Sequence, residues 1–305
     1  MNIDIIKHRN IFFIFSGILI LASIFAFFFF GVKQGIDLAG GTNWQIQIEN
    51  SAIKESDLRP VLDELTGNSN LTIKSLPEGN LLIKLPSISE EDHQKYLQAL
   101  QEKFGKIKEP SFESIGPTVG QELKNRFIWA FLLGLLSIML YVAWAFRKVS
   151  HPVKSWKYGV IVVLSGFHDI IVPVGLMTFL GWRQGIEIDT NFIVALMFIL
   201  GYSVNDTIVV FDRIRENLIL THNKGNFDFA ATINSAVRQT FARSVNTSLT
   251  TVLAIALLYF IGPLSLKYFI LTLMLGIIVG SYSSIFIASP LLYVWHPIKN
   301  KNKVK

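Results

Sequence analysis

The residues of this sequence with the clearest chemical potential are ionisable side chains set inside long apolar runs. Asp206 lies in "LGYSVNDTIVVFDRIREN", and His168 and Asp169 lie together in "LSGFHDIIVPVG". An ionised carboxylate in hydrocarbon costs roughly 2.5 to 3.5 kcal/mol, so a carboxylate placed there is a candidate functional group. The chemistry open to a carboxyl in that setting is the uptake and release of a proton.

A basic residue can control that proton exchange. The run "FARSVNTSLTTVLAI" begins close to Arg243. Because consecutive spans run antiparallel, we expect Arg243 to lie at a depth similar to that of Asp206 and to face it. A buried carboxylate beside a guanidinium stays ionised, whereas one without that partner takes up a proton, so the pair predicts a proton switch. The alternative is that Arg243 is an ordinary basic anchor at the membrane surface.

The other polar residues in these runs have two interpretations each. Adjacent His168 and Asp169 cannot share one helix face, and they form either a hydrogen-bonded packing pair or a proton relay or gate. Asn205, Thr247 and Ser248 either let helices pack closely or hold a chain of water molecules. The sequence has 0 cysteines, so thiol chemistry, disulfides and cysteine metal sites are excluded. No motif for a metal or a cofactor is present, and we expect none to be bound.

Membrane-spanning helices must position these residues. The chain of 305 residues is 51% hydrophobic and only 16% charged, which is outside the range of soluble globular proteins. Stretches of about 20 mostly apolar residues are long enough to cross a bilayer. The sequence has six of them: Ile11–Phe30, Phe127–Phe146, Tyr158–Trp182, Asn191–Phe211, Arg243–Ile261 and Tyr268–Trp295. The first has no small-residue cleavage site, so we expect it to be retained as an anchor.

Basic residues are concentrated in alternate connections and in the closing "KNKNKVK". The positive-inside rule therefore places both termini in the cytoplasm. The net charge of +6 follows from this topology and requires no nucleic-acid partner. The connection before the fifth span is amphipathic and predicts a helix on the cytoplasmic membrane surface, in contact with lipids.

The predicted parts are a cytoplasmic N-terminus with the first span (1–30), an external domain (31–126), spans two to four (127–211), the amphipathic connection (212–242), spans five and six (243–295) and a basic cytoplasmic tail (296–305).

The polar stretch 31–126 predicts one external α+β domain. "NWQIQIE" alternates as a strand does, a helix with Ser56 as N-cap follows, and "NLTIKSLPEGNLLIKLP" reads as a hairpin. A second helix from Ser89 stops at Gly105, and a last strand runs toward Phe112. The order βαββαβ is the ferredoxin-like pattern. Because no nucleophile with a base and no phosphate loop occurs here, we expect a binding or lever domain and not an enzyme.

Several motifs in chain order resemble the SecF family, accessory subunits of the bacterial Sec protein-export machinery. They are "GIDLAGGT", "ESIGPTVGQEL", "HD", "GYSVNDTIVVFDRIREN" and "ARSVNTSLTT", and together they cover essentially the whole chain. The resemblance implies a bacterial inner-membrane protein whose six-helix bundle is half of a resistance-nodulation-division (RND) architecture. It implies a SecD partner, the SecYEG channel, YajC and YidC as further candidate partners, and an unfolded exported preprotein at the external domain.

The resemblance also implies a mechanism, in which the proton gradient promotes late translocation without hydrolysis. The family's proton-path aspartate matches Asp206 and its fifth-span arginine matches Arg243. Ser244 stands where the family usually has threonine, which keeps the hydroxyl. The family's other proton-path carboxylate belongs to SecD, so this chain alone is not expected to complete the path.

Two other functions remain open from the sequence. A small-molecule or lipid exporter subunit of the same superfamily would normally need two external domains and a second six-span half, and the sequence shows no internal repeat. A purely structural stabiliser of the translocase would not need Asp206 or Arg243.

Overall fold

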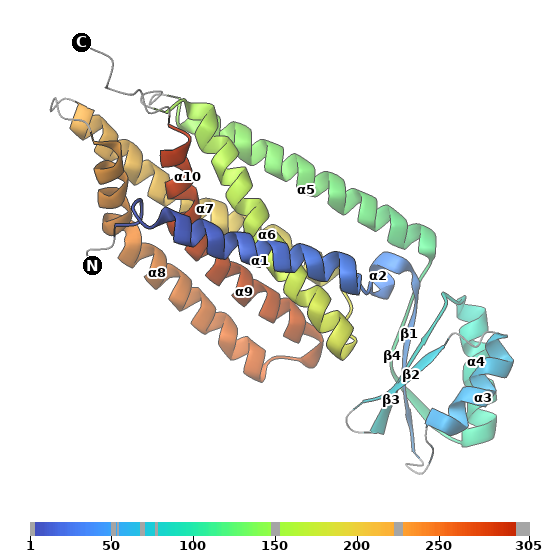
Figure 1. The fold of residues 1–305 in the computed structure, drawn as a ribbon. Helices are drawn as coiled ribbons and strands as arrows, with labels where there is room; N and C mark the ends of the chain where they lie inside the picture. Colours follow the sequence, from blue (N-terminus) through green and yellow to red (C-terminus); the bar gives the residue numbers. More distant parts are fainter. Residues whose placement is uncertain are drawn as a thin grey trace. The chain divides into compact units, whose positions relative to one another are not determined.

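The structure, a computed structural model, describes residues 4–49, 53, 55–67, 71–76, 79–147, 153–222 and 228–296. The chain forms two compact units, one of residues 1–33 with 129–305 and one of residues 34–128 (Figure 1). Six helices within the described residues are long and apolar enough to cross a membrane. The predicted fold, a helical membrane protein with a small α+β domain between the first two spans, is confirmed.

Each expected span is helical, and several helices extend beyond the predicted ends. The stretch 212–222 continues α7, and the stretch 229–242 begins α8, so most of the predicted connection between them is helical. The last span is one path of two α-helices joined by a π-helical turn, η3. The bounds are α1 (Arg9–Phe30), α5 (Pro117–Ala145), α6 (Ser155–Gln184), α7 (Thr190–His222), α8 (Phe229–Ile261), α9 (Lys267–Ser283), η3 (Ser284–Ala288) and α10 (Ser289–Val294).

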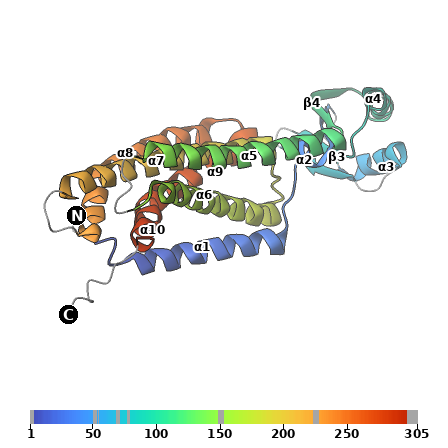
Figure 2. The ribbon, with the colours of Figure 1, turned by 90° about the horizontal axis from the view of Figure 1, so that it is seen from above.

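The spans differ in how much of their surface the protein itself covers. Helix α6 and the last span are the most buried, whereas α1, α5 and α8 expose most of their apolar surface. Helix α9 lies against α6, α7 and α8. Helix α1 lies alongside α6, as the view from above shows (Figure 2). Since a helix that is apolar on all sides needs apolar surroundings, lipid or other protein is expected to cover the exposed faces.

Two glycines bring α9 close to α7. Gly276 and Gly280 are four residues apart, the small-xxx-small spacing that lets helix backbones approach in membranes. A Cβ on Gly280 would lie 3.0 Å from the Cβ of Ser203, and a Cβ on Gly276 would overlap the side chain of Ile199. This contact places the polar residues of α7 directly against the last span.

The π-helical turn η3 has a local cause in the sequence that follows it. Pro290 has no backbone N–H to donate, and in a regular α-helix its ring would clash with the backbone carbonyl four residues earlier. The Ser289 hydroxyl donates to the carbonyl of Ser284 at 3.1 Å, five residues back. A π-helical turn at this point accommodates both Pro290 and the hydrogen bond from Ser289 to Ser284. Such a turn also rotates the side chains that follow it about the helix axis.

The smaller unit is a four-stranded antiparallel sheet in the order β2-β3-β1-β4. Its elements are α2 (Ile36–Ala39), β1 (Gly41–Ile48), α3 (Glu55–Thr66), β2 (Thr72–Ser75), β3 (Asn80–Leu85), α4 (Glu90–Phe104) and β4 (Ile107–Ile115). This is the ferredoxin-like arrangement that the sequence predicted. Helices α3 and α4 lie on the same face of the sheet (Figure 1).

Alternating apolar residues build the core of this domain. Trp44, Ile46 and Ile83 are fully buried, together with Leu62 of α3 and Leu100 of α4. They pack as one cluster because alternate residues of a strand face the same side.

Three predicted helix ends can be compared with the structure. The helix predicted to run from Ser89 to Gly105 is α4, with Ser89 as its N-cap, whose hydroxyl accepts from Asp92 N at 3.1 Å, and with Gly105 directly after its last residue. Ser56, predicted as an N-cap, lies instead within α3, which begins at Glu55. Residues 77 and 78 of the predicted hairpin lie outside the described residues.

Candidate functional site

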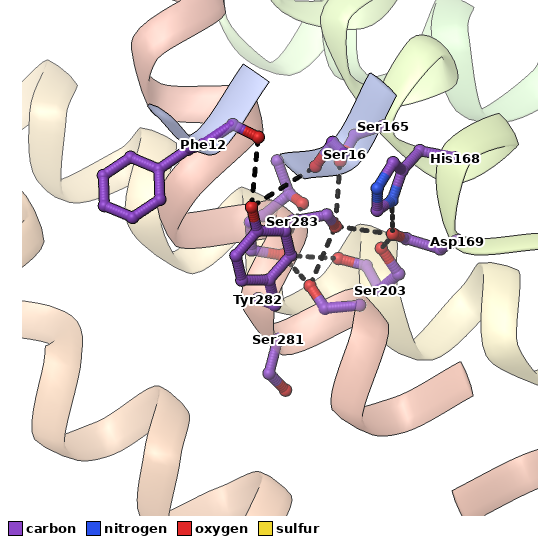
Figure 3. Close-up of polar contacts among 12 residues, drawn as sticks. Phe12, Ser16, Ser165, His168, Asp169, Ser203, Ser281, Tyr282 and Ser283 are labelled. Atoms are coloured by element: carbon purple, nitrogen blue, oxygen red, sulfur yellow. Dashed lines mark hydrogen bonds and ion pairs between the residues drawn. The ribbon is translucent and has the colours of Figure 1, made fainter. Parts of the chain in front are cut away.

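A network of polar side chains surrounds Asp169 inside the helical bundle (Figure 3). Asp169 is 0% exposed. Its Oδ1 accepts from His168 Nδ1 at 2.9 Å, and its Oδ2 accepts from the Ser283 hydroxyl at 2.7 Å and from the Ser203 hydroxyl. Ser165 donates to Ser283 at 3.1 Å. The carboxylate therefore ties α6, α7 and α9 together.

His168 contributes one of its two ring nitrogens to this network. Its ring is 3% exposed and lies 6.3 Å from the Tyr282 ring, centroid to centroid. Nδ1 is used by Asp169, whereas Nε2 is buried and has no hydrogen-bond partner among the described residues. His168 and Asp169 are therefore hydrogen-bonded to each other although they are consecutive on one helix, and one imidazole nitrogen remains open to a proton.

Asp206 lies on α7 and is 8% exposed. Its Oδ2 and the Ser244 Oγ are both buried, and neither has a hydrogen-bond partner in the described part of the chain. The hydroxyls of Ser244 and Ser284 lie beside this carboxylate. The next residue, Thr207, shares a hydrogen bond of 2.8 Å with Ser284. Asp206 is therefore a buried carboxylate with an open oxygen.

Arg243 does not face Asp206 as the sequence predicted. Its side chain is exposed, and it makes no ion pair with Asp206 within the described residues. The reason is helical geometry: Ser244 is buried on the side of Asp206, and the preceding residue points about 100° away around the helix axis. In this structure the charge of Asp206 is not compensated by Arg243.

The remaining predicted residues divide between the interior and the surface. Ser248 is buried, accepts from Tyr202 OH at 3.2 Å and is hydrogen-bonded to Ser281. Asn205 and Thr247 are exposed.

The exposed side of α8 carries a polar face. Arg243, Asn246, Thr247 and Thr250 follow one another at helical spacing, and all four are exposed. The Thr250 hydroxyl donates to the Asn246 carbonyl at 2.9 Å, so its hydrogen bond is made within the same helix. A guanidinium and an amide are costly to leave in contact with lipid tails.

The residues that sequence reasoning missed are the serines and the tyrosine of the last span. In the segment Ser281–Ser284, four consecutive side chains contact four different helices. Ser281 bonds to Ser248 of α8, and Tyr282 donates to the Phe12 carbonyl of α1 at 3.2 Å. Ser283 bonds to Asp169 of α6, and Ser284 bonds to Thr207 of α7. The run "SYSS" inside an apolar span was the available signal.

This arrangement suits the holding and transfer of protons. Two buried carboxylates lie on neighbouring helices, each beside hydroxyl groups that can donate to an ionised form or accept from a protonated one. The described residues contain no group of three or more His, Asp or Glu side chains that could hold a metal ion. The fold and the site thus define a multi-pass helical membrane protein with buried carboxylates in its spans.

Comparisons with known proteins identify the family. Residues 25–52 match the family described as "SecD/SecF GG Motif", and residues 95–297 match "Protein export membrane protein SecD/SecF, C-terminal". The protein translocase subunit SecF of Thermobaculum terrenum is 40% identical, over 96% of this chain and 94% of that protein. The SecF subunit of Sebaldella termitidis is 37% identical, over 99% and 95%.

Solved structures agree with this result. A SecDF structure described as a translocon-associated membrane protein from Thermus thermophilus is 34% identical, with a TM-score of 0.79. A SecDF structure in a super-membrane-facing form is 33% identical, with a TM-score of 0.68. In both cases the match covers 97% of this chain and 39% of the solved chain. The chain belongs to the SecF family of protein translocase subunits, a family of transport proteins and not of enzymes.

Proposed function

We propose that this chain works with a SecD subunit to couple proton flow across the bacterial inner membrane to movement of its external domain, and so promotes the late stage of preprotein export. The observation that carries the proposal is Asp206, a buried carboxylate inside a span with one open oxygen. A structural helix contact does not need such a group, because an unpaired charge in this position costs stability.

The polar face of α8 supports a SecD partner. Arg243 and its exposed neighbours lie on the same helix as Ser244, which is buried close to Asp206. A partner bundle over this face would cover the guanidinium and would bring its own carboxylate near Asp206. The solved SecDF chains, of which this chain matches 39%, are longer than this chain and leave room for such a second half.

The proton gradient supplies enough free energy for such coupling. Moving one charge across 100 mV supplies roughly 2.3 kcal/mol, which biases a two-state equilibrium by a factor of about fifty. Helix α1 leads directly along the chain into the external domain, and Tyr282 of the polar network donates to α1. The remaining proposed partners are the SecYEG channel with YajC and YidC, the exported preprotein at the external domain, and membrane lipids.

The expected orientation has both termini in the cytoplasm and residues 31–126 outside, because the short basic connections alternate along the chain. Because the chain has 0 cysteines, single cysteines report position cleanly. In intact cells Lys95→Cys should react with a membrane-impermeant maleimide, and Lys154→Cys should react only after permeabilisation. Both side chains are exposed, so reactivity depends on the side of the membrane. The opposite labelling pattern would reverse the orientation and remove the external domain from the proposal.

Complementation tests the function as a whole. In cells depleted of their own SecD and SecF subunits, this chain with its SecD partner should restore export, and a protonophore should remove the restored part. The two subunits should also co-purify. Export that is not restored by a co-purifying complex would contradict the proposal. Restored export that is insensitive to the protonophore would favour a purely structural stabiliser.

A further inference from the structure

The last span contains an unusual junction between the two buried carboxylates. Asp169 lies on α6 and Asp206 on α7, and Ser203, three residues before Asp206 on α7, donates a hydrogen bond to Asp169. Each carboxylate lies beside one of two consecutive hydroxyls, those of Ser283 and Ser284. These serines end α9 and begin the π-helical turn η3, so the junction lies where the helix changes its hydrogen-bond pattern.

The two hydroxyls share an acceptor. Ser283 donates to Asp169 Oδ2 at 2.7 Å and also reaches the Gly280 carbonyl oxygen at 3.0 Å. Ser284 reaches the same carbonyl at 2.8 Å and bonds to Thr207 at 2.8 Å. When Asp169 is ionised it attracts the Ser283 hydroxyl, and Ser284 keeps the carbonyl. When Asp169 carries a proton, Ser283 turns to the carbonyl, and Ser284 is freed to donate toward Asp206.

Among the described residues, few other ionisable groups face this junction. His168 on α6 bonds to Asp169, and the Tyr282 ring of α9 lies on the His168 side. Helix α8 presents the Ser244 hydroxyl to Asp206, while its Arg243 is exposed. The two carboxylates and His168 are therefore the groups whose charges compete here.

We propose that the adjacent hydroxyls of Ser283 and Ser284 join Asp169 and Asp206 into one coupled proton-holding pair, in which a proton on Asp169 favours release of the proton from Asp206. Ser283 and Ser284 are positioning residues in this scheme. The π-helical turn keeps them facing α6 and α7, since Ser289 holds the Ser284 carbonyl. The proposal rests on the proposed function, in which Asp206 carries the proton, and it adds a second carboxylate of this same chain to the proton path.

Infrared difference spectroscopy of the purified full chain in lipid nanodiscs tests the coupling. The carbonyl band of a protonated Asp206 is assigned by its loss in Asp206→Asn, and its intensity is followed against pH. Asp169→Asn, which imitates the protonated residue, should move the midpoint of the Asp206 band to lower pH by about one unit, a tenfold change in proton affinity. In a background of Ser283→Ala with Ser284→Ala, that shift should fall to less than half.

Ser281→Ala is the matched control, because Ser281 bonds to Ser248 and not to a carboxylate. It should leave the full shift. The proposal is overturned if Asp169→Asn leaves the titration midpoint of Asp206 unchanged. It is also overturned if Asp169→Asn shifts that midpoint by the full amount in the double serine variant. If Asp169→Asn does not fold, as judged by its thermal transition, Ser284→Ala in the native background should raise the Asp206 midpoint while Ser284→Thr preserves it. Equal midpoints in these two variants overturn the proposal as well.

Export measurements separate this inference from the proposed function. If Asp206→Asn leaves gradient-dependent export intact while the infrared coupling is present, the proposed function fails and the coupled pair stands. If export is lost but the two bands titrate independently, the coupled pair is wrong and the proposed function stands.

Discussion

Asp206→Asn is expected to abolish the part of preprotein export that depends on the proton gradient, while the subunit still inserts and assembles with its SecD partner. The amide preserves the size of the side chain and removes the cost of a buried charge, so folding should not suffer. It cannot exchange a proton in the physiological range. Export in membrane vesicles should therefore match the level measured after the gradient is collapsed, at equal abundance of the complex.

Arg243→Met should impair the same part of export for a different reason. We expect the guanidinium, exposed in this structure, to stabilise the ionised form of Asp206 at another stage of the cycle. Without it the carboxyl would remain protonated. The double variant should then be no worse than either single variant, because both break the same switch.

Asp212→Asn is a suitable control for the loss of an acid from α7, since Asp212 is exposed and bonds to Arg215 at 3.3 Å. It should leave export nearly unchanged. An Asp206→Asn complex that supports gradient-dependent export at the native rate would reduce Asp206 to a structural residue. Strictly additive losses in the double variant would separate the roles of Asp206 and Arg243.

Gly280→Val is expected to destabilise the helical bundle by about 3 kcal/mol, from overpacking of α9 on α7 and weakening of a buried hydrogen bond. The first added carbon would already lie 3.0 Å from the Cβ of Ser203, and valine adds two more. Moving Ser203 would disturb its hydrogen bond to Asp169. The purified chain in detergent should show a clearly lower thermal transition and a reduced yield.

Gly201→Val is the matched control within the same pair of helices. A Cβ on Gly201 of α7 would meet no atom within 4 Å, so this substitution should change the thermal transition little. It also tests whether valine in a span is harmful in itself. Equal losses in the two variants would show that the close approach at Gly280 is not what holds α9 against α7.

The sequence was sufficient to predict the spans and the small α+β domain, because both depend on local periodicity. Twenty-residue apolar runs give helices of spanning length whatever lies beside them. Alternation around Trp44 and helical spacing at Leu58 and Leu62 define which faces are buried in the small domain. Asp206 and Asp169 were identified because a charge in an apolar run stands out without knowledge of its neighbours.

The sequence did not determine the direction in which individual side chains point from their helices. Arg243 and Asp206 share an approximate depth, but depth does not fix rotation about the helix axis, and Arg243 turns outward. The role of Ser203, Ser283 and Ser284 depends on which helices pack together, and small residues such as serine are common wherever membrane helices pack. Their contacts follow from the glycine spacing of α9 and from the π-helical turn, which only the packed bundle reveals.

The segment Ser281–Ser284 has a consequence for how the length of this chain can vary. Each of its four side chains bonds to a different helix, so the last span is fixed in rotation as well as in depth. One residue inserted between Gly276 and Ser281 would turn the segment by about 100° and shift it by about 1.5 Å. Each side chain of the segment would then take the direction that the next residue has now, and would point away from the helix with which it forms its hydrogen bond. Insertions and deletions should therefore be excluded from the first half of this span and tolerated only beyond η3.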